Sequence, residues 1–362
     1  MLDFALALYL GFRHESSELR PWARFTTGVP AALGSPRLAW EVARELAALQ
    51  ACERATLAAS TLHLFWDLFG VLADSPSAIF VDAGTYPIAR WGVERAAARG
   101  VPASTFGHHD PVSLRDLLKA QVRRRSRPMI VTDGFCPSCG RPAPIGDYLI
   151  AAREFGGLLV IDDTQALGIV GHSPGPDAPY GRGGGGMLRR ANVTGPEVVL
   201  ASSMAKAFGV PLAVLSGSGE VVERFETQSE TRMHCSPPSI ATLHAAEHAL
   251  QLNREQGDTV RLRLACLVHH FRTRLREAGL PATGGLFPVQ TLAAISGSDV
   301  AKIHAGLLRS GVRAVLHRSR PDASPRLSFL ITARHTFAQL DRALNSLFRV
   351  VRSTEQPRVA AR

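Results

Sequence analysis

The stretch Ile161-Asp162-Asp163-Thr164-Gln165-Ala166-Leu167-Gly168 ends an apolar run in an acid. Further along, Ala201-Ser202-Ser203-Met204-Ala205-Lys206-Ala207-Phe208-Gly209 places a single lysine in a serine-rich turn after a second apolar run. Short apolar runs that end in polar residues are typical of buried parallel strands, and ligands bind beyond the carboxyl ends of such strands. The two stretches therefore predict an α/β fold with Asp162 and Lys206 at one edge of its sheet.

An aspartate and a lysine in this arrangement match the needs of pyridoxal phosphate (PLP), a cofactor that accepts electrons from a carbanion. Lys206 is the candidate amine for a Schiff base with the aldehyde, and it also moves protons. Asp162 is the candidate carboxylate that keeps the pyridine nitrogen protonated. The alternatives are a surface lysine and a helix N-cap. Because folding needs neither residue, the pair predicts cofactor chemistry.

Strand-like and helical segments alternate along most of the chain. The expected strands are residues 78–82, 129–133, 157–162, 198–202 and 212–216. The expected helices are residues 38–50, 90–99, 112–124 and 145–155. Strands separated by helices of this length predict a mainly parallel central sheet with helices on both faces.

The chain changes character after Pro237-Pro238. A long helix is expected from about residue 240 to 278, with Gly257 as a candidate break. Strands at 287–292 and 326–331 and helices at 300–309 and 337–348 predict a smaller α+β unit. We expect a large domain at 35–254, a small C-terminal domain at 255–352 joined by residues 1–34, and a tail at 353–362.

Composition limits the functional classes. The 362 residues are 46% hydrophobic, enough for a large core and two domains. The formal net charge is +10, from 41 basic and 31 acidic residues, and it reflects either a solvated basic surface or a field that attracts an anionic partner. No arginine run is interleaved with aromatic residues and no nucleic-acid-binding motif is present, so we expect no nucleic acid partner.

The cysteine count and the lengths of the apolar segments indicate where in the cell the protein is expected. Five cysteines do not make a disulfide framework. The start of the chain carries Asp3 and lacks the basic region of a signal peptide, and no run reaches the roughly 18 apolar residues of a membrane span. We therefore expect a cytoplasmic protein without a membrane partner.

Three motifs favour structural interpretations. Cys136-Pro137-Ser138-Cys139 is one CxxC without a second pair at similar spacing, which disfavours zinc or redox use. Residues 183–186 are four glycines without the lysine of a phosphate loop, and they predict a flexible insert. His108-His109-Asp110 suggests a metal or catalytic cluster, but it precedes a helix that Asp110 would cap, so we expect no metal.

Several motifs occur in the order found in one family. They are Val131-Thr132-Asp133-Gly134, the two stretches around Asp162 and Lys206, Tyr9-Leu10-Gly11, Ser236-Pro237-Pro238, Arg326-Leu327 and Thr332-Ala333-Arg334-His335-Thr336. Together they resemble the α-oxoamine synthases, which include the amino-oxononanoate synthases. The similarity spans nearly the whole chain. It implies the fold-type-I PLP-dependent transferase fold and a homodimer with PLP at the subunit interface.

The resemblance also implies roles for the candidate residues. Lys206 would carry the Schiff base, and Asp162 would pair with the pyridine nitrogen. Ser203 would bind the cofactor phosphate, as would the backbone amides of a turn at Ser60-Thr61-Leu62. Arg326 would hold the substrate carboxylate.

Other positions depart from the family pattern. Tyr86 stands where the family stacks a histidine on the ring, and Gln165 stands where a second histidine contacts the ring hydroxyl. Asp133 replaces a glutamate, Thr61 replaces a glycine, and His234 replaces a phosphate-binding threonine of the partner subunit. The chain begins only eight residues before Tyr9, so most of the N-terminal arm that closes over the acyl substrate is expected to be missing.

Each departure has a structural alternative. Tyr86 could pack in the core, and Gln165 could be a satisfied polar residue in a turn. His234 could be a structural histidine, and Arg326 could be a surface strand residue. Gln165 can donate a hydrogen bond like the histidine it replaces, but it does not titrate.

The residues and the resemblance together predict a PLP-dependent acyltransferase. It would condense an amino acid with an acyl thioester, either an acyl-CoA or an acyl carrier protein, to give an α-amino ketone. Lys206 would remove the α-proton, unless decarboxylation generates the carbanion. The first alternative is a diverged PLP aminotransferase, racemase or decarboxylase. The second is a non-catalytic binding protein on the same fold.

Overall fold

The computed structural model describes residues 1–73, 77–122, 126–293, 297–318 and 324–355. A seven-stranded sheet forms its centre. In spatial order the strands are β2 (Arg54–Ala58), β10 (Ala213–Gly217), β9 (Val198–Ser203), β8 (Leu158–Asp162), β5 (Arg127–Asp133), β3 (Ser77–Asp82) and β4 (Ala103–Phe106). Strand β10 runs antiparallel to both of its neighbours, and all the other pairs are parallel. The predicted mainly parallel α/β fold is confirmed.

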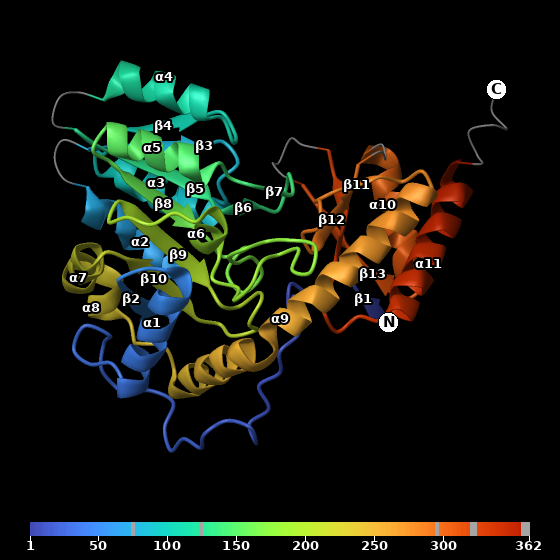
Figure 1. Ribbon diagram of the computed structural model, residues 1–362, viewed down its shortest axis with the longest axis horizontal. Coiled ribbons are helices and arrows are strands. Elements are labelled where there is room, and N and C mark those ends of the chain that lie inside the picture. The colour runs from blue at the N-terminus through green and yellow to red at the C-terminus, as the bar shows by residue number, and fades with distance from the viewer. Residues whose placement is uncertain (74–76, 123–125, 294–296, 319–323, 356–362) are drawn as a thin grey trace.

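Helices cover both faces of this sheet (Figure 1). They are α1 (Arg37–Gln50), α2 (Thr61–Leu72), α3 (Pro87–Ala98), α4 (Pro111–Gln121), α5 (Ile145–Glu154), α6 (Met187–Ala191), α7 (Gly219–Gln228) and α8 (Glu230–His234). Alternate residues of β8 point to opposite faces, as the pleat of a strand requires. Leu159 and Ile161 join the core that includes α1, α4 and α5, whereas Leu158 and Val160 join the core of α2, α3 and α7.

A second sheet lies at the far end of the long helix α9 (Ile240–Glu277) (Figure 1). It contains β11 (Ala282–Thr283), β12 (Val289–Leu292), β15 (Arg326–Leu330) and β14 (Val315–His317), with α10 (Gly297–Arg309) and α11 (Phe337–Glu355) nearby. Strand β1 (Leu2–Asp3) pairs with β13 (Val312–Arg313), and Phe4 packs on Phe329. The first residues therefore lie with the C-terminal part of the chain. The predicted domain boundaries stay a prediction.

Some predicted elements differ from the structure. Helix α9 continues through Gly257, where the absence of a side chain leaves room for Asn253 and Arg261. The turn expected at 60–62 is the beginning of α2, which the sequence missed because its residues are mostly apolar and show no clear polar face. The short strands β2 and β4 and the helices α7 and α8 were also missed. The expected end of the helix at 112–124 and the end of the tail, 356–362, lie outside the described residues.

The glycine run at 183–186 is a packed loop, so the prediction of a flexible insert was wrong. Gly184, Gly185 and Gly186 are buried. Gly186 has a φ of 86°, and a Cβ there would collide with the Asp163 carboxylate. Asp163 is itself fully buried and accepts a hydrogen bond from the Met187 amide at 3.0 Å. A side chain would not fit between this carboxylate and the loop, which explains the glycine.

Among the described residues, no helix combines the length and the apolar character that crossing a membrane requires.

Candidate functional site

The predicted site residues gather at one edge of the central sheet because the strand register aligns their ends. Asp133 on β5 lies opposite Asp162 on β8, and Asp162 lies opposite Ala201 on β9. Ser203 ends β9 and lies opposite Ala213 on β10, which in turn pairs with Ala58 at the end of β2. The turns that leave this edge carry the remaining candidates, as expected for a ligand site in such a sheet.

Lys206 lies in the turn between β9 and β10, with its Nζ 5.7 Å from the centre of the Tyr86 ring. Burial lowers the pKa of Lys206, and the carboxylates of Asp162 and Asp133 partly offset that effect. A lowered pKa favours the neutral amine, the form that attacks a carbonyl group. The Tyr86 side chain is 47% exposed, so it does not pack in the core as the structural alternative required.

Asp162 and Asp133 are both nearly buried. Burial raises the pKa of Asp162, and burial together with the Asp162 charge raises the pKa of Asp133 well above its usual range. The Thr164 amide donates to Asp162 Oδ1 at 3.0 Å, and the Tyr86 amide donates to Asp133 Oδ1 at 3.0 Å. Two adjacent buried carboxyls with raised pKa values form a place where a bound cationic group is stabilised.

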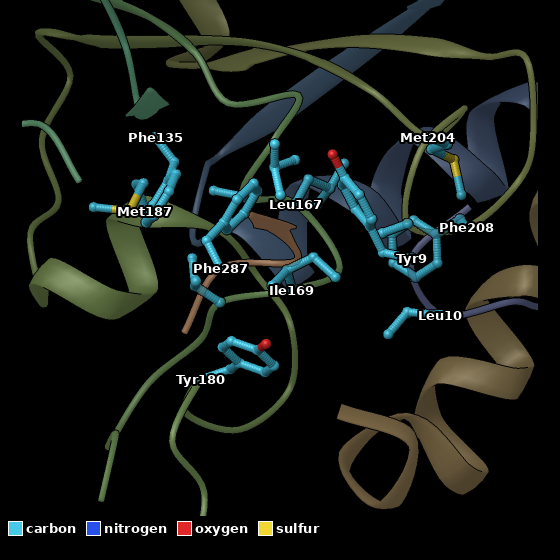
Figure 2. Close-up of a cluster of buried hydrophobic side chains, with 14 of the residues drawn as sticks. Tyr9, Leu10, Phe135, Leu167, Ile169, Tyr180, Met187, Met204, Phe208 and Phe287 are labelled. Carbon is cyan, nitrogen blue, oxygen red and sulfur yellow. The ribbon is translucent and has the colours of Figure 1, made fainter. Parts of the chain in front are cut away.

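Gln165 is buried, and Tyr9 orients its side chain. The Tyr9 hydroxyl donates to Gln165 Oε1 at 2.9 Å. Burial raises the pKa of Tyr9, so the hydroxyl keeps its proton. The Tyr9 ring packs edge-to-face on Phe287, 5.7 Å away, within the buried cluster of Figure 2. Oε1 accepts this bond, and Nε2 carries the donors of the amide, so Nε2 is the group that can donate toward a ligand.

Thr164 joins the aspartate stretch to the lysine turn, a role that the sequence analysis missed. Its Oγ1 accepts a hydrogen bond from the Ser203 amide at 3.1 Å. The Ser203 hydroxyl in turn accepts one from the Ala205 amide at 3.1 Å. The signal was present, because a hydroxyl residue two positions after an aspartate is typical of a hydrogen-bonded turn.

The beginning of α2 offers backbone amides at the same edge. Thr61 and Leu62 are its first residues, and the Ser60 hydroxyl bonds His63 Nδ1 at 2.8 Å instead of capping the helix. A helix start without a capping side chain presents free N–H groups, which favour an anion such as a phosphate. Strand β2, which precedes α2, ends beside Ala213, the neighbour of Ser203.

Two predicted residues stand apart from this group. His234 is the exposed last residue of α8. Arg326 begins β15 in the second sheet, near His317, whose pKa is lowered by burial and by the Arg326 charge. In the described part of the chain, no hydrogen bond or ion pair joins His234 or Arg326 to Lys206. The roles of both residues stay predictions.

A cavity of about 750 Å³ lies elsewhere, against α1 and β2. Trp40, Arg54 and Arg232 contribute to its lining, and none of the predicted site residues does. The cavity is therefore separate from the group around Lys206.

Comparison with known families identifies a match over most of the chain. The model of the family described as aminotransferase class I and II matches residues 40–347. An 8-amino-7-oxononanoate synthase from Nitrosococcus oceani is 29% identical over 254 residues, which are 70% of this chain and 64% of that protein. The match thus spans slightly less than two thirds of the relative's length.

Two solved structures share the fold. Serine palmitoyltransferase from Sphingomonas wittichii aligns with a TM-score of 0.84 and 16% identity, over 97% of this chain and 87% of that chain. The 8-amino-7-oxononanoate synthase from Francisella tularensis aligns with a TM-score of 0.78 and 16% identity, over 98% of both chains. These likenesses confirm the predicted fold-type-I PLP-dependent transferase fold.

Proposed function

We propose, because this chain belongs to the aminotransferase class I and II family of PLP-dependent enzymes, that it condenses an amino acid with an acyl thioester to give an α-amino ketone. The relatives named 8-amino-7-oxononanoate synthase confirm the resemblance to the α-oxoamine synthases. The observation that carries the proposal is the half-buried Lys206 side chain, whose pKa is lowered, beside Asp162, Asp133 and Tyr86.

The residues at this edge fit PLP, which supplies an electron sink when it is bound. Asp162 would accept a hydrogen bond from the protonated ring nitrogen and keep it protonated, because a cation beside the carboxylate offsets the cost of its burial. The amides of Thr61 and Leu62 would bind the phosphate at the beginning of α2, together with the Ser203 hydroxyl. Gln165 would donate from Nε2 to the ring hydroxyl.

The remaining residues would orient the substrate and move its proton. Lys206 Nζ would remove the α-proton of the amino acid, and its lowered pKa favours the neutral amine that can accept a proton. Tyr86 would cover one face of the cofactor ring. Asp133 would hold the Tyr86 backbone through its hydrogen bond. Arg326 would bind the substrate carboxylate, and the acyl group would arrive on CoA or on an acyl carrier protein.

We also propose that two copies of the chain form a homodimer. Phe25, Leu33 and Trp40 are large apolar side chains that are 62%, 78% and 67% exposed. Exposed apolar groups of this size favour a protein interface. In the sequence, His234 lies between Arg232 and Pro238, and these two residues line the cavity beside Trp40. The exposed His234 side chain would therefore face the second copy. Light scattering should give a dimer mass, and Trp40→Glu should give a monomer; a wild-type monomer would contradict the proposal.

The cofactor part of the proposal has a direct test. The purified chain is incubated with PLP, reduced with borohydride, digested and analysed by mass spectrometry. We expect a reduced adduct on the Lys206 peptide. Lys206→Ala should lose the adduct, whereas Lys302→Ala should keep it because that lysine is exposed. An absence of adduct on wild-type Lys206 would refute the cofactor role.

The reaction is tested by a screen of amino acids against acyl-CoA donors. We expect an amino ketone product in the mass spectrum and an equal amount of free CoA thiol. Amino-group exchange with 2-oxo acids, without thiol release, would instead show an aminotransferase. PLP binding without any turnover would favour a binding protein. A cytoplasmic location stays a prediction.

A further inference from the structure

Two histidines and a cysteine meet beside the segment that carries Tyr86. His108 and His109 follow β4, and Cys139 lies in the hairpin of β6 (Phe135–Cys136) and β7 (Arg141–Pro142). His108 Nε2 lies 3.3 Å from Cys139 Sγ, and His109 Nδ1 lies 4.0 Å from the same sulfur. One donor atom of each residue lies within 4.8 Å of the other two.

These distances match the dimensions of a zinc site. Zinc bonds of about 2.3 Å to sulfur and about 2.0–2.1 Å to nitrogen place tetrahedral N and S donors about 3.6 Å apart. The two N···S distances, 3.3 Å and 4.0 Å, lie on either side of that value. Imidazole and thiolate are also the ligand types that favour zinc over magnesium or calcium.

Asp82 holds His108 in the orientation that a metal requires. The carboxylate is 1% exposed, and its Oδ1 lies 2.6 Å from His108 Nδ1. A proton on Nδ1 leaves the lone pair of Nε2 directed at Cys139. A carboxylate behind a ligating histidine is the usual arrangement around protein-bound zinc. Asp82 is itself held by the amides of Gly84 at 2.7 Å and His109 at 2.9 Å.

His109 has two unusual features, and neither involves its Nδ1, the atom that faces Cys139. Its Nε2 is buried without a hydrogen-bond partner among the described residues. Its backbone is left-handed, with a φ of 54°, a conformation that costs a non-glycine residue about 1–2 kcal/mol. This backbone turn places the rings of His108 and His109 3.8 Å apart, on the side where Cys139 lies.

The hairpin supplies a second thiol. Cys136 is 2% exposed, and its Sγ accepts a hydrogen bond from the Cys139 amide at 3.5 Å. The Gly140 amide bonds the Cys136 carbonyl oxygen at 2.9 Å and closes the turn. Cys136 lies outside the group of donor atoms that are all within 4.8 Å of one another, so it would reach the ion only by moving with the turn. With that movement, the CxxC turn and the two histidines would form a Cys₂His₂ donor set. In the sequence, His108 and His109 stand out as a candidate cluster, but the lack of a second cysteine pair and the cap expected at Asp110 favoured a structural interpretation.

We propose that His108, His109 and Cys139, with Cys136 as the fourth ligand, bind one structural zinc ion. The ion would connect three segments: the turn after β3, the loop after β4 and the hairpin. The first leads to Tyr86, and Gly84 has no room for a side chain because the His108 ring packs on it. The hairpin points toward β11 and β12 in Figure 1, and its Gly140 packs against Gly284. The proposal depends on neither PLP nor the acyl transfer.

The test is the metal content of the tag-free protein, grown with added zinc and desalted. We expect inductively coupled plasma mass spectrometry to find one equivalent of zinc per chain, whether or not PLP is present. Cys139→Ser and His108→Ala should lose the zinc. Cys266→Ser should keep it, because that cysteine is exposed on α9.

A second measurement needs no variant. The wild-type protein is stripped with a chelator under reducing conditions and titrated with Co²⁺. We expect a near-ultraviolet thiolate-to-cobalt band that saturates at one equivalent and disappears when zinc is added. Wild-type protein that contains no zinc and gives no such band would overturn the proposal. A Cys136–Cys139 disulfide in freshly purified protein would overturn it as well.

Discussion

The hydrogen bond from Tyr9 to Gln165 should link chain stability to cofactor affinity. Tyr9→Phe removes the hydroxyl and keeps the ring in the buried cluster of Figure 2. The change leaves Gln165 Oε1 buried without the donor that now lies 2.9 Å away. An unsatisfied buried acceptor costs about 1–3 kcal/mol. We therefore expect the free energy of unfolding to fall by about 2 kcal/mol.

The same change should weaken PLP binding. Without the Tyr9 hydroxyl, the Gln165 amide can rotate, and Nε2 no longer has a fixed direction toward the cofactor. We expect PLP affinity to fall about five- to tenfold, which is about 1–1.4 kcal/mol. Urea unfolding followed by circular dichroism measures the stability, and fluorescence titration with PLP measures the affinity.

Tyr180→Phe is the matched control. The Tyr180 hydroxyl is also buried and donates to the Leu286 carbonyl oxygen at 2.5 Å, within the same cluster. This variant should lose similar stability and keep its PLP affinity. If Tyr9→Phe and Tyr180→Phe weaken PLP binding equally, Tyr9 does not act through Gln165. If Tyr9→Phe leaves the urea midpoint unchanged, the bond contributes nothing.

Three further predictions concern other parts of the chain. Burial lowers the pKa of His335, so the stability from its neutral ring is full above about pH 6.5 and is lost as the pH falls toward the lowered pKa. Urea midpoints at pH 7.5 and 5.5 should show this loss, and His335→Gln should reduce the difference. Arg261 is 2% exposed and bonds Asp258 and Asn253, so Arg261→Met should cost about 3 kcal/mol in urea unfolding, whereas the exposed Arg254→Met should cost less than about 1 kcal/mol. Tyr86→Ala should weaken PLP binding about fivefold through lost stacking, and Tyr86→His should stay within a few fold of wild type; equal affinity in all three proteins would show that Tyr86 does not contact the ring.

Local sequence patterns were sufficient to predict the central sheet and the edge that carries the candidate site. Apolar runs that end in Asp133, Asp162 and Ser203 are buried strands, and parallel strands in register bring their ends together. The lysine turn follows one of these ends directly. For this reason the group around Lys206 could be expected before any tertiary contact was known.

Other features depend on contacts between distant segments, which local patterns do not contain. Helix α2 is mostly apolar, so its sequence has no period that reveals a helix, and its place is set by packing on the sheet. Gln165 is oriented by Tyr9, which lies 156 residues earlier in the sequence. His108 meets Cys139, 31 residues further on, only because β3, β4 and the hairpin fold to the same end of the sheet. A side chain's neighbours across the fold are chosen by how whole elements pack, and the residues beside it in the sequence carry no record of them.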